Sequence, residues 1–528
     1  MRLLMRGLRQ TLTPIIFLLV GCFLMPVAIS YAQEQTGPAQ DLELLDAVRM
    51  AIGLNPAVLL QTEQTKFYRG AYDAAGGPFD TLLKGDIARD DQRLSLTKSN
   101  QALAGGETES VTRTTSYTLG LQQQLRTGTV LSLGGGMTRS DENLLQVFPE
   151  NRSSVSFQVV QPLFRGRGSS AADVTGEKAA GKQYEASLQD LYFTINRNVL
   201  DTAEAYWDYV AASKNLEILR ESEAKAARLI EEIKELIAAD ERPRSDLGQV
   251  EANLADKSAA RISAEQALFQ ARQVLGLKMG ASSEQIAALG YPKTTFPVSD
   301  EAASAAINSD GLQKLACSRR PDLKADAIRE EGVAFLVAGA ENDLLPRVDL
   351  QLAMGYSGLT EGRSTRNFFT PFTDNTAGPN VTARLSMALP LRNSGARGTL
   401  IQQKAVLEQQ KITRNERKRQ ISSDVSVAVS ALLTSMKGVE KSERAVKFYR
   451  DAIEDEKAKL KLGLSTLIDL ISLEDRLTNA LVVNVAQHIR YSKAVIELRF
   501  ETGTLIECSD KGCLIGPEQL SRLPDGRS

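Results

Sequence analysis

The sequence predicts a mainly α protein with some β structure, in which a helix–strand–strand–long helix–helix unit occurs twice. A Pro-Leu pair closes a β-like run and opens a long helical stretch at Pro162-Leu163 and again at Pro390-Leu391. Each long stretch is followed by an Asp-Leu pair, Asp246-Leu247 and Asp469-Leu470. Aromatic residues make up only 5% of the chain, which favours long helices packed through small residues over a thick globular core. A repeated order of motifs indicates a duplicated architecture.

Residues 1–32 are expected to form a signal peptide. Three arginines precede an apolar run, and Ser30-Tyr31-Ala32 has the small-x-small pattern of a cleavage site, so cleavage is expected after Ala32. An uncleaved anchor and a lipoprotein lipidated on Cys22 stay open as alternatives. Beyond the signal peptide, no apolar run reaches the ~20 residues of a membrane-spanning helix.

The first structural repeat is expected at 33–280. It opens with a helix that is interrupted at Asn55-Pro56. Strands are expected over about 79–162, where apolar residues alternate with Ser, Thr, Gly and Gln at the period of a strand with one apolar face. A long helix is expected at about 169–239 and a return helix at 245–277. The coiled-coil seam of the long helix is formed by Ala226, Ile230, Ile233 and Ile237.

A connector is expected at 281–310, because glycines and prolines interrupt the helical pattern there. The second structural repeat is expected at 311–506. Its strands are expected at about 347–391, its long helix at about 393–462 and its return helix at 466–500.

The C-terminal tail, 507–528, contains Cys508 and Cys513 on either side of a short loop. This pair is able to form a disulfide in an oxidising compartment. Cys317 has no evident partner and is expected to be a buried small residue.

The lengths of these elements predict an assembly. Each long helix of about 70 residues would run ~105 Å, and two of the shorter helices placed end to end would match it. The second repeat supplies two strands and the first supplies two to four. A single-chain outer-membrane barrel uses at least ~8 strands, and open strand edges cannot lie in lipid. We therefore expect several identical chains to share one barrel.

Several motifs together resemble the TolC-like family of outer-membrane efflux proteins. They are Asn55-Pro56, Gln161-Pro162-Leu163, Arg320-Pro321-Asp322-Leu323, Leu389-Pro390-Leu391, Gly463-Leu464-Ser465 and Glu501-Thr502-Gly503. Each motif alone is weakly specific, and their order and spacing over about 41–506 carry the resemblance. It implies a homotrimer in the outer membrane of a Gram-negative bacterium, with a twelve-stranded β-barrel continued by a long periplasmic α-helical barrel. It also implies contact with a periplasmic adaptor (membrane fusion protein), an inner-membrane pump or ABC exporter, and outer-membrane lipid.

In this family the turns at the periplasmic tip form both the closed gate and the adaptor contact. The resemblance places these roles here on Asp246, Leu247, Gly463, Leu464, Ser465, Asp469 and Leu470. Members with an acidic constriction carry a second aspartate where this chain has Ser472, whereas Glu474 and Asp475 follow slightly later. The alternative for Asp246 and Asp469 is an acid near a helix N-terminus that the helix dipole favours.

No set of residues indicates catalysis. The chain has one histidine, His488, inside a helical stretch, and it lacks a Gly-rich phosphate loop or a metal-spaced cluster. We therefore expect no enzyme activity, cofactor or metal, and the net charge of −2 gives no footprint for nucleic acid. The expected function is an outer-membrane channel of a tripartite efflux or type I secretion system, passively conducting substrate to the exterior. The alternative is a periplasmic coiled-coil adaptor or scaffold.

Overall fold

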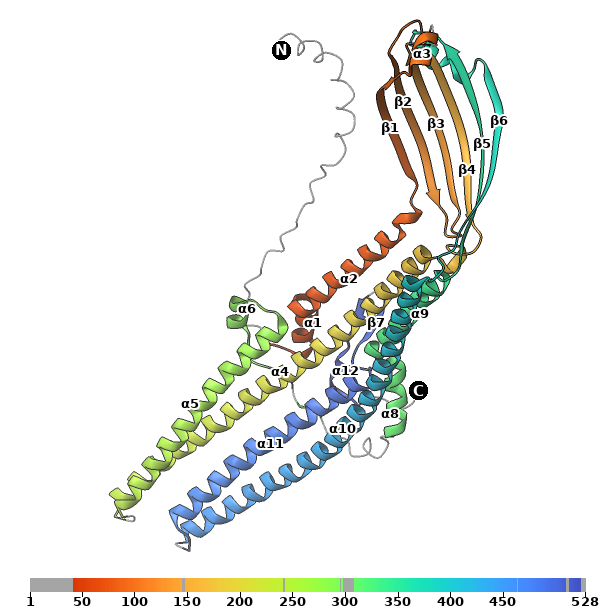
Figure 1. The fold of residues 1–528 in the computed structure, drawn as a ribbon. Helices are drawn as coiled ribbons and strands as arrows, with labels where there is room; N and C mark the ends of the chain where they lie inside the picture. The colour runs from red at the N-terminus through yellow and green to blue at the C-terminus, as the bar shows by residue number, and fades with distance from the viewer. Residues whose placement is uncertain are drawn as a thin grey trace, which may run out of the picture. The chain divides into compact units, whose positions relative to one another are not determined.

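The structure, a computed structural model, is mostly helical with one large antiparallel sheet (Figure 1). It describes residues 41–144, 148–240, 243–294, 296–297, 308–462, 464–509 and 512–523. The expected signal peptide with Cys22 and the tip residue Gly463 lie outside the described residues.

The helices of the N-terminal half begin and end at sequence signals that are easy to recognise. They are α1 (Leu44–Leu54), α2 (Pro56–Gly76), α3 (Lys98–Leu103), α4 (Ala172–Ala238), α5 (Ser245–Met279) and α6 (Ser283–Ala288). Asn55 separates α1 from α2 and accepts a hydrogen bond from the Ala57 N–H at 2.8 Å. Pro56 follows at the first helical position, where a missing N–H costs nothing. Gly280 ends α5 with a φ of 73°.

The C-terminal half contains α8 (Ser309–Arg319), α9 (Pro321–Asn342), α10 (Ser394–Lys461), α11 (Leu467–Glu501) and α12 (Pro517–Ser521). The helical segment before β5 is broken at Arg320, before Pro321, because proline starts a helix readily and cannot continue one. Figure 1 shows α4–α5 and α10–α11 as two antiparallel hairpins, and α4 also packs against α9, α2 and α11.

The large sheet is an antiparallel meander in which each strand pairs with its neighbours in sequence. Its strands are β1 (Leu82–Ser95), β2 (Glu109–Gln124), β3 (Val130–Glu142), β4 (Glu150–Pro162), β5 (Arg347–Glu361) and β6 (Thr376–Ala388). The chain thus contributes six strands to this sheet, two more than the four that each chain of a twelve-stranded trimer would supply. Within one chain, β1 and β6 are edge strands.

Two smaller features complete the described chain. β7 (Glu507–Ser509) pairs with β8 (Gly512–Leu514), so that Cys508 and Cys513 stand opposite each other. The helical core is centred on the single tryptophan, Trp207, which is 1% exposed and stacks on Phe296 at 5.7 Å. None of the described helices is by itself long and apolar enough to cross a membrane. Of the described helices, only α1 and α2 taken together, as a bent pair, have the required length and apolar composition.

Candidate functional site

One face of the large sheet is apolar from edge to edge. Directly opposed residues in an antiparallel sheet point to the same face. One such row crosses the whole sheet through Leu83, Leu121, Leu133, Phe157, Met354 and Val381. The next row towards the loops contains Gly85, Leu119, Gly135, Val155 and Tyr356.

These apolar side chains are exposed in the single chain. Phe157 is 41% exposed, Leu83 is 63% exposed and Val381 is 71% exposed. A contiguous exposed apolar face of this extent marks contact with a membrane or a partner. The opposite face is polar, and one of its rows consists of Asp86, Thr118, Gly136, Ser154 and Ser357. The sheet therefore separates an apolar side from a side suited to water.

The height of the apolar face fits a lipid bilayer. On β5 its apolar positions run from Val348 to Tyr356. That distance is about 27 Å along the strand, or about 21 Å along the membrane normal at a tilt of ~40°. Outer-membrane barrels present an apolar band of ~25 Å. Towards the loops the same face becomes polar, where Arg139 donates a hydrogen bond to Asn151 at 2.7 Å.

The second predicted site is the turn between α10 and α11, which a capping box closes. The Asp469 N–H donates to the Thr466 hydroxyl at 3.3 Å, and the Thr466 N–H donates to the Asp469 carboxylate at 3.2 Å. The Thr466 hydroxyl, which donates to the Asp469 carboxylate at 2.6 Å, and the Thr466 N–H hold the pKa of Asp469 below its ordinary value. Asp469 thus takes part in capping the N-terminus of α11.

Further contacts order the same turn. The Leu464 N–H donates to the Lys459 carbonyl at 3.0 Å, which satisfies an end group of α10. Ser465 donates to the Glu456 carboxylate. This hydrogen bond, together with one from Lys459, lowers the pKa of Glu456. Both carboxylates nearest the turn are therefore engaged in hydrogen bonds.

The structure brings apolar residues of the two tips together. Leu247 and Leu467 belong to one buried cluster with Ile230, Ile233 and Val250. Leu470 is also buried, at 5% exposure, whereas Leu464 is 75% exposed and Ile468 is 58% exposed. Asp246 lies half-buried in the first turn of α5. Of the predicted tip residues, Leu247 thus packs where the two hairpins meet, Leu470 is buried within the α10–α11 hairpin, and Leu464 is exposed.

The acidic residues beyond Ser472 are not equivalent. Asp475 forms an ion pair with Lys257 of α5, which compensates its charge. Glu474 is partly buried, and this burial raises the pKa of its carboxyl. The ion pair and the hydrogen bond between Ser222 and Thr478, at 3.3 Å, join the α4–α5 hairpin to α11.

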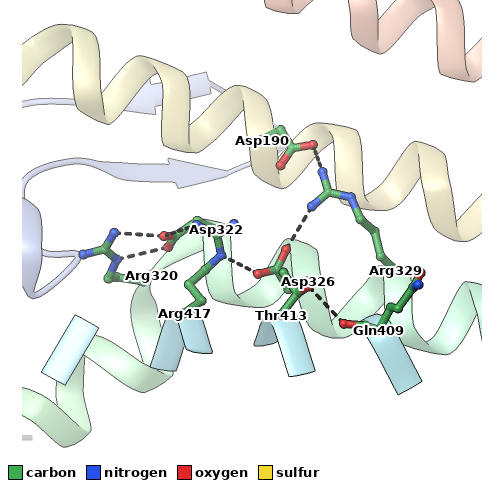
Figure 2. A network of polar contacts seen from close by, with 8 residues as sticks. All are labelled: Asp190, Arg320, Asp322, Asp326, Arg329, Gln409, Thr413 and Arg417. Atoms are coloured by element: carbon green, nitrogen blue, oxygen red, sulfur yellow. Dashed lines mark hydrogen bonds and ion pairs between the residues drawn. The ribbon is translucent and has the colours of Figure 1, made fainter. Parts of the chain in front are cut away.

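A buried ionic network lies farther along the helices, and sequence reasoning recognised only part of it (Figure 2). Arg320 donates to both carboxylate oxygens of Asp322, at 3.0 and 2.8 Å, and also binds Glu501. These carboxylates raise the pKa of the Arg320 guanidinium although its burial acts in the opposite direction. The Arg320-Pro321-Asp322 and Glu501-Thr502-Gly503 motifs therefore meet in space.

The remainder of the network joins three helices. Asp326 of α9, 3% exposed, binds Arg329 at 3.1 Å and also Arg417 of α10. Arg329 additionally binds Asp190 of α4. Asp190, Asp326, Arg329 and Arg417 carried no sequence signal, because their partners lie on helices far apart in the chain.

The described residues contain no cluster of three or more metal-ligating side chains that could hold a metal ion. His488 stacks on Phe296 at 5.3 Å, and its Nε2 lies 3.3 Å from a Glu443 carboxylate oxygen. This histidine thus packs within the helices and forms an ion pair when it is protonated.

Comparison with known proteins shows a resemblance to one family. Residues 312–504 match the family model described as outer membrane efflux protein. The chain is also 23% identical over 382 residues to the outer membrane protein TolC of Vibrio cholerae, covering 71% of this chain and 82% of that protein. The chain therefore resembles the TolC-like outer membrane efflux protein family, as its motifs indicated. This resemblance supports an outer-membrane location and a role in transport, and it supports the expectation that the protein is not an enzyme.

Solved structures of outer-membrane proteins share the fold. The Campylobacter jejuni CmeC outer membrane channel matches with a TM-score of 0.64 and 14% identity, covering 90% of each chain. The outer membrane protein VceC from Vibrio cholerae matches with a TM-score of 0.62 and 16% identity, covering 87% of this chain and 96% of that one. These matches support the mainly helical fold with a sheet that the sequence predicted.

Proposed function

We propose that this protein is the outer-membrane channel of a tripartite efflux or type I secretion system. It would conduct substrate passively from an inner-membrane pump or ABC exporter and a periplasmic adaptor to the exterior. The observation that carries the proposal is the sheet with one exposed apolar face and one polar face. In a barrel, this arrangement places lipid outside and water inside.

The proposal includes a homotrimer. The single chain leaves both edge strands of its sheet unpaired, and such edges cannot lie in lipid. Closure by further copies satisfies the backbone groups of β1 and β6. The helical part would then extend into the periplasm as an α-helical barrel, with helices of the length of α4, 67 residues, reaching about 100 Å.

We also propose that the chain contains two structural repeats, 33–280 and 311–506, joined by 281–310 and followed by the tail 507–528. Three features support this division. The long helices have 67 and 68 residues, and the return helices have 35 residues each. In both halves, a proline starts a helix, and the residue before this proline lies against a glycine with positive φ. These pairs are Asn55 with Gly280 and Arg320 with Gly503. The segment 1–32 would be a cleaved signal peptide.

The tips of the two helical hairpins would form the gate and the adaptor contact. The buried cluster containing Leu247 and Leu467 would hold the hairpins together in the closed state. The exposed Leu464 and Ile468 would be available to the adaptor. Opening would separate the α4–α5 hairpin from α10–α11.

A reversible disulfide tests this gate. In the double variant Ser222→Cys/Thr478→Cys, the two side chains replaced lie 3.3 Å apart on different hairpins. Oxidation should lower efflux, and reduction should restore it, because the bond prevents the hairpins from separating. Each single variant serves as the control. Unchanged efflux with the disulfide fully formed would contradict the gate while leaving the channel itself standing.

The alternative of a periplasmic adaptor or scaffold predicts a different location. Membrane fractionation should place the protein in the outer membrane, with the mass of three chains in detergent. Recovery in the periplasmic fraction as a monomer would overturn the proposed function.

A further inference from the structure

We infer that the β1–β2 hairpin is part of the membrane barrel and that β1 of one chain pairs with β6 of a second copy. Three chains would then close a barrel of about eighteen strands instead of twelve, since each contributes six. This inference rests on the proposed function, because it presumes that the sheet lies in the membrane as part of a trimer.

The hairpin continues the same two-faced sheet without interruption. β1 pairs with β2 from Leu82 to Ser95, and β2 pairs with β3 over 13 residue pairs. Leu83 and Ile87 stand opposite Leu121 and Tyr117, so the apolar face reaches the edge of β1. A hairpin outside the membrane would have no reason to match this face in register.

On this face, a leucine side chain packs over glycines of the neighbouring strands. Leu119 lies between Gly85 of β1 and Gly135 of β3, and its Cδ1 would be 3.7 Å from a Cβ added at Gly85. The side chain of one strand therefore covers the bare backbone of its neighbour. This packing ties β1 into the same surface as the central strands.

The end of the hairpin nearest the helices is fixed by contacts with α4. Arg126, in the β2–β3 turn, donates two hydrogen bonds to Glu177 at 2.8 and 2.5 Å. Gln124 donates to Asp173 at 2.8 Å. The Arg126 guanidinium also lies 4.8 Å from the ring centre of Phe79, in the short segment between α2 and β1. The hairpin is therefore held at the level where β4 leads into α4.

A close backbone contact also joins the β2–β3 turn to the junction between β4 and α4. The Gly168 N–H donates to the Thr127 carbonyl at 2.9 Å. Gly128, in the same turn, has a φ of 86°, and a Cβ there would lie 2.0 Å from the Gly166 carbonyl oxygen. Only glycine allows this approach of the β2–β3 turn to the β4–α4 junction.

The charges of β1 lie where a membrane strand tolerates them. Beyond Ile87, the residues on the apolar side become Arg89, Asp91 and Arg93, at the loop end of the strand. Asp91 binds Arg113 of β2 at 3.3 Å. Arg139 occupies the same zone on β3. The charged positions thus begin on neighbouring strands where the apolar band ends, as expected at the membrane surface.

The inference changes the expected width of the channel. At a strand spacing of ~4.8 Å and a tilt of ~40°, eighteen strands give a backbone diameter of about 36 Å, against about 24 Å for twelve. The polar face, rich in Ser, Thr and Gly, would line this wider opening. We therefore expect the β-barrel to admit larger cargo than a twelve-stranded barrel.

Disulfide mapping distinguishes the two barrels. In a Cys317→Ser background, Ala88→Cys on β1 is combined in turn with Asn380→Cys, Thr382→Cys or Ser386→Cys on β6. The matched control set combines Thr138→Cys on β3 with the same β6 variants, because β3 would be the edge of a twelve-stranded barrel. Ala88 and Thr138 lie on the same polar row, opposite Ser116.

We expect covalent links between subunits in the β1 set and none in the β3 set. Links in the β3 set, or none in the β1 set from intact trimers, would overturn the inference. A protein that is not trimeric in detergent would instead contradict the proposed function, so the two failures are distinguishable.

Spin labels provide a second measurement that does not depend on register. A label at Ile87→Cys should collide with oxygen dissolved in lipid, and a label at Asp86→Cys should collide with a water-soluble relaxing agent. Equal access of the water-soluble agent to both positions would place the hairpin outside the membrane and overturn the inference.

Discussion

Replacing Phe157 by Arg should strongly destabilise the membrane part, because this side chain lies in the middle of the apolar face. On β4, Phe157 has Val155 and Val159 on the same face, and Leu133 and Met354 stand opposite it on the neighbouring strands. An arginine on the lipid face near the bilayer midplane costs about 2–4 kcal/mol. Each chain should therefore lose about 30- to 700-fold in its folding equilibrium, and a trimer would contain three such sites.

Ser156→Arg is the matched control. Ser156 is the next residue along β4 and points to the polar face, where its opposed neighbours are Gly134 and Gly355. Neither glycine has a side chain to obstruct a longer residue. We expect a change within about 0.5 kcal/mol, typical of a substitution at a solvated position.

Folding into lipid vesicles across a urea series measures both variants. The folded fraction is read from the heat-modifiable band on a gel, and the midpoint should fall for Phe157→Arg and remain near wild type for Ser156→Arg. Equal midpoints for the two variants, or a greater loss for Ser156→Arg, would refute the assignment of the two faces.

Four other predictions follow from the helices. Thr466→Ala should lower the free energy of unfolding by about 1 kcal/mol and raise the rate of hydrogen exchange in residues 464–470, because it removes the cap of α11. Exchange in α4 serves as the control and should not change. The pKa of Asp469 is lower in the folded protein than its ordinary value of 3.8, so the ionised carboxylate stabilises the tip above that pH, and this stabilisation is lost as pH falls through the lowered pKa. Asp469→Asn should therefore remove the pH dependence of hydrogen exchange at the tip. A pH dependence that persists in this variant would contradict the role of Asp469. Asp326→Ala should lower the free energy of unfolding in urea by about 1.5–3 kcal/mol, since it removes the buried carboxylate that Arg329 and Arg417 share; Glu331→Ala, which breaks an exposed pair with Lys182, should cost less than about 1 kcal/mol. Gly280→Ala should be destabilising, because the φ of Gly280 is 73° and a Cβ would lie 2.5 Å from the Leu54 carbonyl oxygen. Gly248→Ala, inside α5 with no atom near the added Cβ, should instead raise the free energy of unfolding by about 0.5–1 kcal/mol. Similar thermal midpoints for the two variants would refute the reasoning.

The mainly helical fold with a sheet was predictable from the sequence, as was the TolC-like family. Prolines and glycines marked the helix ends, and alternation was clear on β4, where Val155, Phe157 and Val159 share a face. The number of strands was not predictable. β1 carries Asp86, Arg89, Asp90, Asp91 and Arg93, and these charges obscure its short apolar segment.

The tip residues were found through the resemblance, whereas their division into buried and exposed sets required the structure. Leu467 and Leu470 are buried while Leu464 and Ile468 are exposed, although all four are apolar residues of one turn. The ionic network around Asp326 was beyond the sequence for another reason. A contact between α4, α9 and α10 depends on helix packing, and periodicity within one helix does not specify it.

Single-channel conductance in a planar bilayer, with the oligomeric mass determined in detergent, tests the central claim most directly. The claim is that three chains form a water-filled outer-membrane channel that the helical tips close. We expect a trimer with a small, fluctuating conductance that rises when Leu247→Ala and Leu467→Ala loosen the buried tip cluster. A monomer or dimer that gives no conductance would contradict the account.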